Sequence, residues 1–433
     1  MKSFQFTGSI IVTLISGFAF ADLALAVDSD IAAEVSPGWS LETVAEVDQS
    51  YAGWDVEIGD ADNDGKNEIL TTGCPDSRLY LFKKTEASWE TRMLAENLAN
   101  QNPGMGLSVR AVDLNHDGKK EIILGTGEER GGTAFLYLLE TDGRAITRRV
   151  VSRPEDINKS SFTHNLAVHD LDNDGADEVI SAYCGGGEVI RYDFDAALSK
   201  VEARKVYHLS GSGEESIIAD VDNDGSMEYV TSNSFRTGKA RVEIFEFDAN
   251  GELMTPPRVA IEGYGGIPCF YASFMVGDIN NDGKNELVVG WKREQAVNKT
   301  TLLAYRVAEV PALVATLEIE TEDLDMAYFE KMMAVADADN DGRDELLVST
   351  RGDASSENIT SGRLGRVYRY NVDGVGNVKR ELLADFDPAY AESTWLAVGD
   401  ADNDGRNEIV LATGKGDRTQ PGTSHVVILR TTH

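Results

Sequence analysis

The sequence predicts an all-β fold, a seven-bladed β-propeller with four antiparallel strands in each blade. Two observations carry this prediction. A nine-residue motif, clearest at 60–68 as DADNDGKNE, occurs seven times in the 433 residues, and successive copies start 50 to 63 residues apart. A short run rich in β-branched residues, such as 178–181, follows the motif. Regular repetition of strand-forming units at about this spacing is typical of a radially repeated β architecture.

The motif places oxygen-bearing side chains at positions 1, 3 and 5, glycine at position 6 and glutamate at position 9. A hard cation such as calcium takes about six to eight oxygen ligands at about 2.3–2.6 Å. Side chains two residues apart in a tightly curled loop converge on one point, and the glycine permits the positive φ that brings the glutamate round. A single acidic turn would suit any bend, but seven copies in phase indicate metal binding.

We therefore expect up to seven calcium ions, one for each motif. The predicted ligands, four for each motif in chain order, are Asp60, Asp62, Asp64 and Glu68; Asp113, Asn115, Asp117 and Glu121; Asp170, Asp172, Asp174 and Glu178; Asp220, Asp222, Asp224 and Glu228; Asp278, Asn280, Asp282 and Glu286; Asp337, Asp339, Asp341 and Glu345; and Asp400, Asp402, Asp404 and Glu408. An EF-hand is excluded, because its position-12 glutamate is absent and strand-like residues follow the motif. The motif is thus predicted to join two strands of a hairpin.

The same four strands are expected in each repeat. In the third repeat, 166–168 leads into the motif, 178–181 leads out of it, and 188–192 and 202–206 complete the unit. The other fourth strands are expected at 89–94, 145–151, 258–261, 313–319 and 378–383.

The seventh repeat stops at 425–430 without a fourth strand, whereas 39–45, before the first motif, has strand character and no repeat of its own. We predict that this N-terminal strand completes the last blade. Closure of the ring in this way would remove the exposed edge of an open sheet array.

The first 26 residues are typical of a secretory signal peptide. Lys2 gives a basic start, 10–15 forms an apolar core, and the small residues fit cleavage after Ala21 or Ala26. This segment is too short for a membrane span, and no later stretch is apolar enough to form one. We expect a secreted protein, extracellular or periplasmic, whose single propeller domain covers 27–433.

The charge of the chain argues against nucleic-acid binding. The formal net charge is −34, and nucleic-acid binding needs clustered Lys and Arg. Twenty-six of the acidic residues are motif ligands, so much of the acidity serves metal chelation. The three cysteines, Cys74, Cys184 and Cys269, are too few for a disulfide framework.

The motif, together with strands such as 365–370 (GRVYRY), resembles the FG-GAP/VCBS repeat family. That family includes the seven-bladed propeller of integrin α chains and some secreted lectins. The resemblance covers nearly all of the mature chain, and 73–75 is the nearest match to the Gly-Ala-Pro sequence of integrins. It implies a calcium-binding propeller with an extracellular binding role.

Ligand binding is expected on the face opposite the motifs, where long polar loops would join the second and third strands. These loops are 127–132, 232–239, 292–300, 351–363 and 414–424. At the mouth of the central channel, the candidate ligand-binding residues are Trp54, Glu214, Glu215, Lys331 and Trp395. Aromatic rings would stack on a sugar and carboxylates would bond its hydroxyls, although water-solvated channel residues would look the same in sequence. The leading expectation is non-catalytic recognition of an extracellular glycan or protein.

The alternative function is that of a carbohydrate-active enzyme, a polysaccharide lyase with its site in the channel. Arg110 would neutralise a uronate carboxylate, and His164 or a tyrosine, Tyr51 or Tyr271, would remove the α-proton as general base. The sequence contains no serine-hydrolase elbow, zinc-protease helix or phosphate loop. Convergence of His164, Arg110 and a tyrosine hydroxyl in the channel would favour the lyase.

Overall fold

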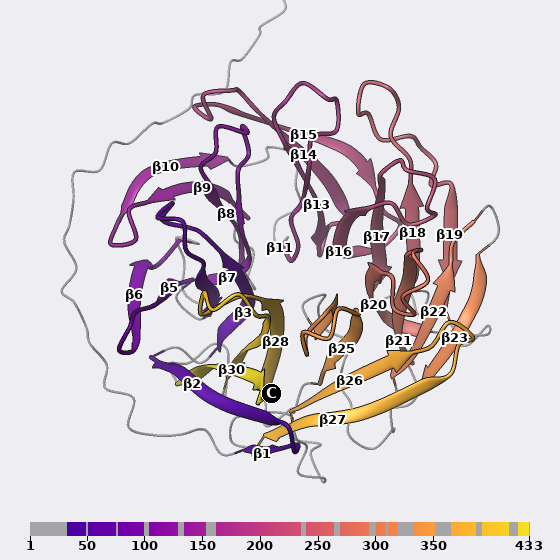
Figure 1. Cartoon of the computed structure of the whole chain (residues 1–433). Coiled ribbons are helices and arrows are strands. Elements are labelled where there is room, and N and C mark those ends of the chain that lie inside the picture. The colour runs from indigo at the N-terminus through magenta and orange to yellow at the C-terminus, as the bar shows by residue number, and fades with distance from the viewer. Residues whose placement is uncertain are drawn as a thin grey trace, which may run out of the picture.

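The computed structural model describes residues 33–48, 51–74, 77–98, 104–128, 134–152, 162–234, 240–263, 269–293, 300–308, 311–318, 332–350, 365–386, 392–414 and 423–432. The predicted signal peptide lies outside these ranges. The strands form seven four-stranded antiparallel blades arranged in a ring, as the sequence predicts (Figure 1). Within the described ranges, no helix is long and apolar enough to cross a membrane.

The blades follow one another in chain order, each built from the channel outward. Blade 1 is β3 (Tyr51–Gly59), β4 (Glu68–Cys74), β5 (Leu79–Lys84) and β6 (Trp89–Ala95); blade 2 is β7 (Gly104–Val112), β8 (Glu121–Glu128), β9 (Leu136–Thr141) and β10 (Ile146–Ser152). Blade 3 has an inner edge in two pieces, β11 (Phe162–Thr163) and β12 (Ala167–His169), followed by β13 (Glu178–Cys184), β14 (Glu188–Phe194) and β15 (Val201–His208). Blade 4 is β16 (Ser212–Ala219), β17 (Glu228–Ser234), β18 (Arg241–Phe245) and β19 (Val259–Glu262).

The last three blades repeat the pattern. Blade 5 is β20 (Cys269–Gly277), β21 (Glu286–Arg293), β22 (Thr300–Arg306) and β23 (Ala312–Glu318); blade 6 is β24 (Met333–Ala336), β25 (Glu345–Ser349), β26 (Arg366–Val372) and β27 (Val378–Phe386). Blade 7 is β28 (Glu392–Gly399), β29 (Glu408–Gly414) and β30 (Ser424–Thr431), with β2 (Trp39–Val47) as its outer strand.

The N-terminal strand closes the ring, which confirms the prediction. β2 pairs antiparallel with β30, from Trp39 opposite Thr431 to Val47 opposite Ser424. In Figure 1 the indigo β2 lies beside the yellow β30, so a strand from near each end of the described chain contributes to one sheet. The last blade therefore cannot form completely until both β2 and the C-terminal strand β30 have been synthesised.

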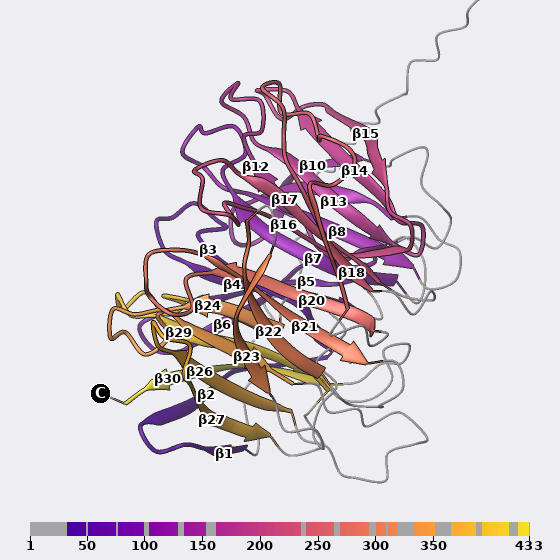
Figure 2. The same ribbon diagram turned by 90° about the vertical axis from the view of Figure 1, so that its right-hand side faces the viewer.

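A further N-terminal strand was not anticipated from the sequence. β1 (Ala33–Val35) adds a fifth strand to blade 6 by pairing with β27, with Ala33 opposite Phe386. Figures 1 and 2 both show β1 beside β27. A strand of three residues is too short to show a period-two pattern, which explains why the sequence did not reveal it. The N-terminal segment thus ties blade 6 to blade 7.

The apolar core lies between the blades, in seven clusters that each join two neighbours. Successive side chains of a strand point to opposite faces of its sheet. In β25, for example, Leu346 and Val348 pack toward blade 5, while Leu347 packs toward blade 7. Each blade consequently buries both faces, and this accounts for the nearly continuous apolar runs after the motifs.

The closure predicts a graded effect of N-terminal truncation. Compared with a chain that starts at residue 27, a start at 36 removes β1, and a start at 49 also removes β2. β2 buries Trp39, Val44 and Val47 to 8, 2 and 1% exposure. Burial of a large apolar side chain stabilises by about 1.5–3 kcal/mol, so we expect the 49–433 chain to lose several kcal/mol and to aggregate through the freed edge of β30.

Thermal melting and size-exclusion chromatography of the three chains measure this effect. The 36–433 chain should stay monomeric with a smaller drop in melting temperature. A 49–433 chain that is monomeric and melts like the longest one would show that β2 is dispensable for closure.

Candidate functional site

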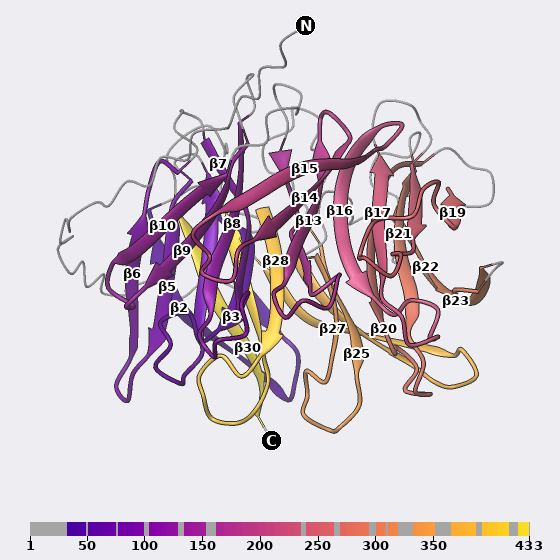
Figure 3. The same cartoon turned by 90° about the horizontal axis from the view of Figure 1, so that it is seen from above.

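All seven motifs join the first and second strands of their blades, as predicted, so they emerge on one face of the ring. Figure 3 shows the ring edge-on, with the yellow loop between β28 and β29 at its lower edge. The motifs are numbered here as loops 1 to 7, by blade. Their positions are numbered 1 to 9 from the first aspartate.

One hydrogen-bond network shapes every loop. In loop 1, Asp60 Oδ1 accepts from the Asp64 amide at 3.0 Å, and Oδ2 accepts from the Gly65 amide at 2.9 Å. The same two bonds form in the other six loops. Gly65 has a φ of +86°, a conformation that favours glycine. The motif therefore has glycine at position 6 because of the backbone conformation there.

The network points the predicted ligands at one another. In loop 1, ligand oxygens of Asp60, Asp62 and Glu68 lie within 4.8 Å of one another, and loops 3, 4 and 6 show the equivalent group. Glu68 Oε2 also accepts from the Ala61 amide at 3.0 Å, which holds the position-9 carboxylate over the loop. Positions 1, 3 and 9 can therefore bind a single cation from three sides.

Buried oxygen atoms in the loops fit a cation. Asp62 Oδ1 and Asp402 Oδ1, both at position 3, are buried and accept no hydrogen bond. A buried carboxylate oxygen without a partner costs free energy, and a coordinated cation would remove that cost.

Burial raises the pKa of the glutamate at position 9 in every loop. In loop 2, burial together with the charges of Asp117 and Glu140 raises the pKa of Glu121 to about 7. Burial likewise raises the pKa of Glu178, Glu228, Glu345 and Glu408 to about 7. Clustered, buried carboxylates of this kind are unfavourable in their charged form unless a positive charge joins them.

A basic side chain of the same blade supplies part of that charge in six loops, a feature that the sequence analysis missed. These residues are Lys83, Arg191, Arg258, Arg306, Arg369 and Arg430. Lys83 Nζ lies 2.5 Å from Asp62 Oδ2, 2.7 Å from Asp64 Oδ2 and 3.0 Å from Glu68 Oε1. Its ammonium thus contacts three of the four predicted ligands of loop 1.

Position 4 of the motif joins neighbouring blades. Asn403 of loop 7 accepts from the Asn67 amide at 2.7 Å and donates to the Asn67 carbonyl at 3.0 Å. The same pair of bonds links position 4 to position 8 of the next loop at 63 and 120, 223 and 285, 281 and 344, and 340 and 407. We call this pair the position-4 clasp. The recurring asparagine was visible in the sequence, but its partner lies in another repeat.

Loop 2 departs from this pattern, since His116 stands at position 4. Its Nε2 lies 3.2 Å from Asp177 Oδ1 at position 8 of loop 3. Loops 2 and 3 therefore stay in contact, but through two side chains, whereas a clasp pairs a side chain with backbone groups.

The candidate channel residues occupy different environments. Glu215 is buried, and its Oε2 accepts from the Phe274 amide of blade 5 at 2.6 Å. Trp395, 1% exposed, packs in the apolar cluster between blades 7 and 1. Lys331 and the side chains of Trp54, Tyr51 and Tyr271 lie outside the described part of the structure.

Arg110 and His164 have different partners. Arg110 Nη1 donates to Asp55 Oδ2 at 2.7 Å, and its Nη2 donates to Asn165 Oδ1, so it links blades 1, 2 and 3. His164 Nε2 lies 3.9 Å from Glu214 Oε2, in blade 4. The tyrosine that a lyase would need is not described, so the predicted trio stays untested.

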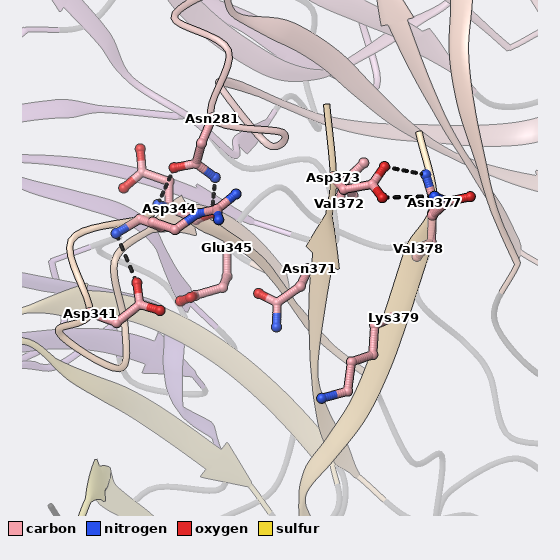
Figure 4. Close-up of a pocket in the computed structure, with 11 residues that line it drawn as sticks. Asn281, Asp341, Asp344, Glu345, Asn371, Val372, Asp373, Asn377, Val378 and Lys379 are labelled. Atoms are coloured by element: carbon pink, nitrogen blue, oxygen red, sulfur yellow. Dashed lines mark hydrogen bonds between the residues drawn. The ribbon is translucent and has the colours of Figure 1, made fainter. Parts of the chain in front are cut away.

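A cavity of about 390 Å³ opens on the motif face between blades 5 and 6. Asn281 and Asp344, which form a position-4 clasp, line one wall, and Asp373, Asn377 and Lys379 of the β26–β27 hairpin line the other (Figure 4). Amides, carboxylates and an ammonium can bond several hydroxyl groups of a polar ligand. The sequence did not indicate this cavity, because loop 6 and the β26–β27 hairpin of blade 6 lie apart in the chain and Asn281 comes from blade 5. The long loops expected to bind ligand lie largely outside the described residues.

Comparison with known proteins agrees with the fold. An FG-GAP-like repeat model matches residues 170–231 and 220–289, which run from the motif of blade 3 through the motif of blade 5. The chain is thus a β-propeller with FG-GAP-like repeats, which confirms the resemblance seen in the sequence. No curated protein matches it.

Two solved structures share the fold at low identity. One is BBS1N in complex with ARL6DN, with 13% identity and a TM-score of 0.50, covering 91% of this chain and 98% of that one. The other is the periplasmic gluconolactonase PpgL of Pseudomonas aeruginosa, with 14% identity and a TM-score of 0.52, covering 77% of this chain and 84% of that one. At these identities the likeness concerns the fold alone.

The position-4 clasp predicts a stabilising role for asparagine that does not depend on metal ligation. Asn403 has a φ of +65°, and Asn403→Gly keeps that backbone conformation accessible while removing both side-chain bonds to blade 1. We expect a loss of about 1–3 kcal/mol in the free energy of unfolding, measured in urea with calcium present.

Asn403→Ala should cost about 1 kcal/mol more, because a Cβ disfavours this φ. Asn97→Gly, at an exposed position with a φ of +54°, is the matched control and should be close to neutral. Equal stability of Asn403→Gly and the unmodified protein would show that the clasp contributes nothing.

Proposed function

We propose that this chain is a secreted, calcium-binding β-propeller that recognises an extracellular glycan or protein. The observation that carries the proposal is the repetition of one loop geometry, with converging carboxylates, on a single face of a closed ring. Repetition matters because each loop alone could be an acidic turn. Seven loops with one hydrogen-bond network indicate a common ligand.

Calcium suits the donor set better than other common cations. The ligands are carboxylate and amide oxygens, which hard cations prefer, and no motif contains a sulfur ligand. Magnesium demands a smaller octahedral shell and dehydrates reluctantly, whereas calcium accepts a flexible shell of about six to eight oxygens. The secretory start of the sequence agrees with calcium, because it directs the protein toward calcium-containing fluid.

The basic residues beside the loops compete with calcium for the carboxylates and offset part of their repulsion when calcium is absent. In loop 1, Lys83 already contacts three carboxylates, so an entering cation would displace its ammonium toward solvent. Loop 5 combines Asn280 at position 3 with Arg306, which lies 2.6 Å from both Asp282 and Glu286. We expect this loop to bind calcium most weakly.

The rigid scaffold and its polar surfaces support the proposed recognition of a ligand. A closed ring holds its loops in fixed relative positions, which lowers the entropic cost of binding. The cavity between blades 5 and 6 has a volume within the usual range for small ligands, about 300–1,000 Å³, and its polar walls suit sugar hydroxyls. The proposal therefore names two candidate binding places, this cavity on the motif face and the face opposite the motifs.

No described contact favours the lyase alternative. Arg110 would have to exchange Asp55 and Asn165 for a substrate carboxylate, although Asp55 is 1% exposed and would lose its cationic partner in a buried place. This rearrangement costs free energy, so we propose ligand recognition rather than lyase activity as the function.

A glycan array and a uronate-polysaccharide assay test the proposed function together. The calcium-loaded protein should bind a defined set of glycans, or a secreted protein in a pull-down, without forming the unsaturated products of eliminative cleavage. Lys379→Ala in the cavity should weaken glycan binding, while Lys200→Ala, in a turn of blade 3, serves as the control. Formation of unsaturated uronate products that is lost in His164→Ala would establish the lyase instead.

Removal of calcium should destabilise the protein strongly and in more than one step. A ligand present at 100 times its dissociation constant stabilises the folded state by about 2.7 kcal/mol for each site, against a usual total stability of about 5–15 kcal/mol. We expect a chelator to lower the melting temperature, calcium to restore it and magnesium to restore it poorly. Metal analysis showing no bound calcium, with melting indifferent to chelator, would overturn the proposal.

Lys83 offers a sharper test of the site. Lys83→Met removes the competing ammonium, so calcium affinity of loop 1 should rise by about tenfold, which corresponds to about 1.4 kcal/mol. Without calcium the same variant should be less stable, because three carboxylates lose their partner.

The gap in melting temperature between calcium-loaded and chelated protein should therefore widen. The matched control is Lys84→Met, whose ammonium lies 3.1 Å from Glu42, outside the predicted ligands. If Lys83→Met narrows the gap or leaves it unchanged, Lys83 and calcium do not share the site.

A further inference from the structure

The inner ends of blades 3 and 4 hold a second cluster whose chemistry differs from that of the loops. It consists of His164, Cys184 and Glu214, and their ligand atoms all lie within 4.8 Å of one another. The Cys184 thiol donates to Glu214 Oε1 at 3.4 Å, and His164 Nε2 lies 3.9 Å from Glu214 Oε2. His164 and Glu214 are 6 and 4% exposed, so the cluster is largely shielded from water.

The cluster lies at the end of the ring opposite the motif loops. Cys184 is the last residue of β13, which starts at loop 3 and runs away from it. Glu214 is near the start of β16, which runs toward loop 4, and His164 lies between β11 and β12. Figure 1 shows β11, β13 and β16 close together beside the channel. The cluster therefore belongs to the face on which ligand binding was expected from the sequence.

An imidazole, a thiol and a carboxylate form a donor set typical of zinc. Zn²⁺ binds His nitrogen at about 2.0–2.1 Å, Cys sulfur at about 2.3 Å and carboxylate oxygen at about 2.0–2.2 Å. Tetrahedral geometry then sets ligand atoms roughly 3.3–3.7 Å apart. The separation of 3.4 Å between Cys184 Sγ and Glu214 Oε1 already fits, and His164 Nε2, which lies 3.9 Å from the other oxygen of the same carboxylate, would move closer to share the metal. Calcium, by contrast, prefers oxygen ligands alone.

We propose that His164, Cys184 and Glu214 form a zinc site with three protein ligands. The fourth tetrahedral position would be left for water or a ligand, as in zinc sites with an exchangeable position. On binding, the Cys184 thiol loses its proton to solvent and the thiolate takes the metal, so affinity falls as pH decreases.

A neighbouring hydroxyl positions the sulfur. Ser212 Oγ donates to Cys184 Sγ at 3.3 Å and accepts from the Gly185 amide at 2.7 Å. Such contacts orient a metal ligand before the ion arrives. The thiol is therefore held between Glu214 and Ser212 rather than free to rotate.

The combination occurs once among the seven repeats. Fourteen residues after the first motif position, where blade 3 has Cys184, the other blades have Cys74, Gly127, Ser234, Lys292, Arg351 and Gly414. Blade 1 shares the cysteine, but Trp54 stands where blade 3 has His164. A purely structural role at this strand end would not require the trio, and Cys74 supplies a natural control.

Cobalt binding tests the proposal directly. We expect the calcium-saturated protein, kept reduced with a thiol-free reductant, to bind one equivalent of Co²⁺ with a thiolate-to-cobalt charge-transfer band, which Zn²⁺ then removes. The calcium loops cannot produce this band because their ligands are oxygens, so the result is independent of the proposed function. Cys184→Ser should abolish the band, and Cys74→Ser and Cys269→Ser should retain it.

Loss of the band in Cys184→Ser could also come from misfolding, so two further variants that keep the thiol are needed. Glu214→Gln and His164→Gln should each weaken Co²⁺ binding at least about tenfold while melting near the temperature of the unmodified protein. The proposal is overturned if the unmodified protein gives no band, if the band survives in Cys184→Ser, or if both Gln variants bind Co²⁺ with unchanged affinity. Binding of zinc only at millimolar concentration, without the band, would equally show that the cluster is a hydrogen-bonded part of the blade interface.

Discussion

Every blade of this ring depends on burying apolar side chains against both of its neighbours. A four-stranded sheet with two apolar faces cannot be stable alone in water, so each blade needs one on either side. The first and last blades satisfy this need only by meeting each other. Two features hold these blades together: the pairing of β2 with β30 and the apolar cluster that contains Val44, Val56 and Val410. Closure is therefore the condition on which the rest of the architecture rests.

The motif face adds polar contacts between blades to the apolar ones. Position-4 clasps join loops 4 to 5, 5 to 6, 6 to 7, 7 to 1 and 1 to 2 by paired hydrogen bonds, and the clasp between Asn403 and Asn67 links the same two blades, 7 and 1, where the ring closes. The predicted ligands at positions 3 and 5 flank position 4 in the chain, so a cation would draw together groups whose neighbour already contacts the next blade. Metal binding and blade packing are for this reason coupled in the proposed function.

The two faces of the ring carry different chemistry. The motif face gathers oxygen ligands and basic side chains, and it also bears the polar cavity between blades 5 and 6. At the opposite end, His164, Cys184 and Glu214 gather nitrogen, sulfur and oxygen. The proposed calcium ions in the loops and the proposed zinc ion at the opposite face would not compete for sites. Calcium prefers oxygen ligands, whereas zinc also prefers nitrogen and sulfur.

The sequence by itself determined the elements that repeat, which are the loop geometry and the four strands of each blade, and it also indicated the closing strand, predicted at 39–45 and found at Trp39–Val47. Local rules suffice for these features, because glycine conformation, β-branched runs and ligand spacing act within about ten residues. Only the tertiary structure decided which groups meet across repeats. The packing of strands and blades brings together Lys83 and Asp62 of loop 1, Asn403 and Asn67, and Cys184 and Glu214. Their spacing along the chain carries no signal, since the ring sets their distance in space.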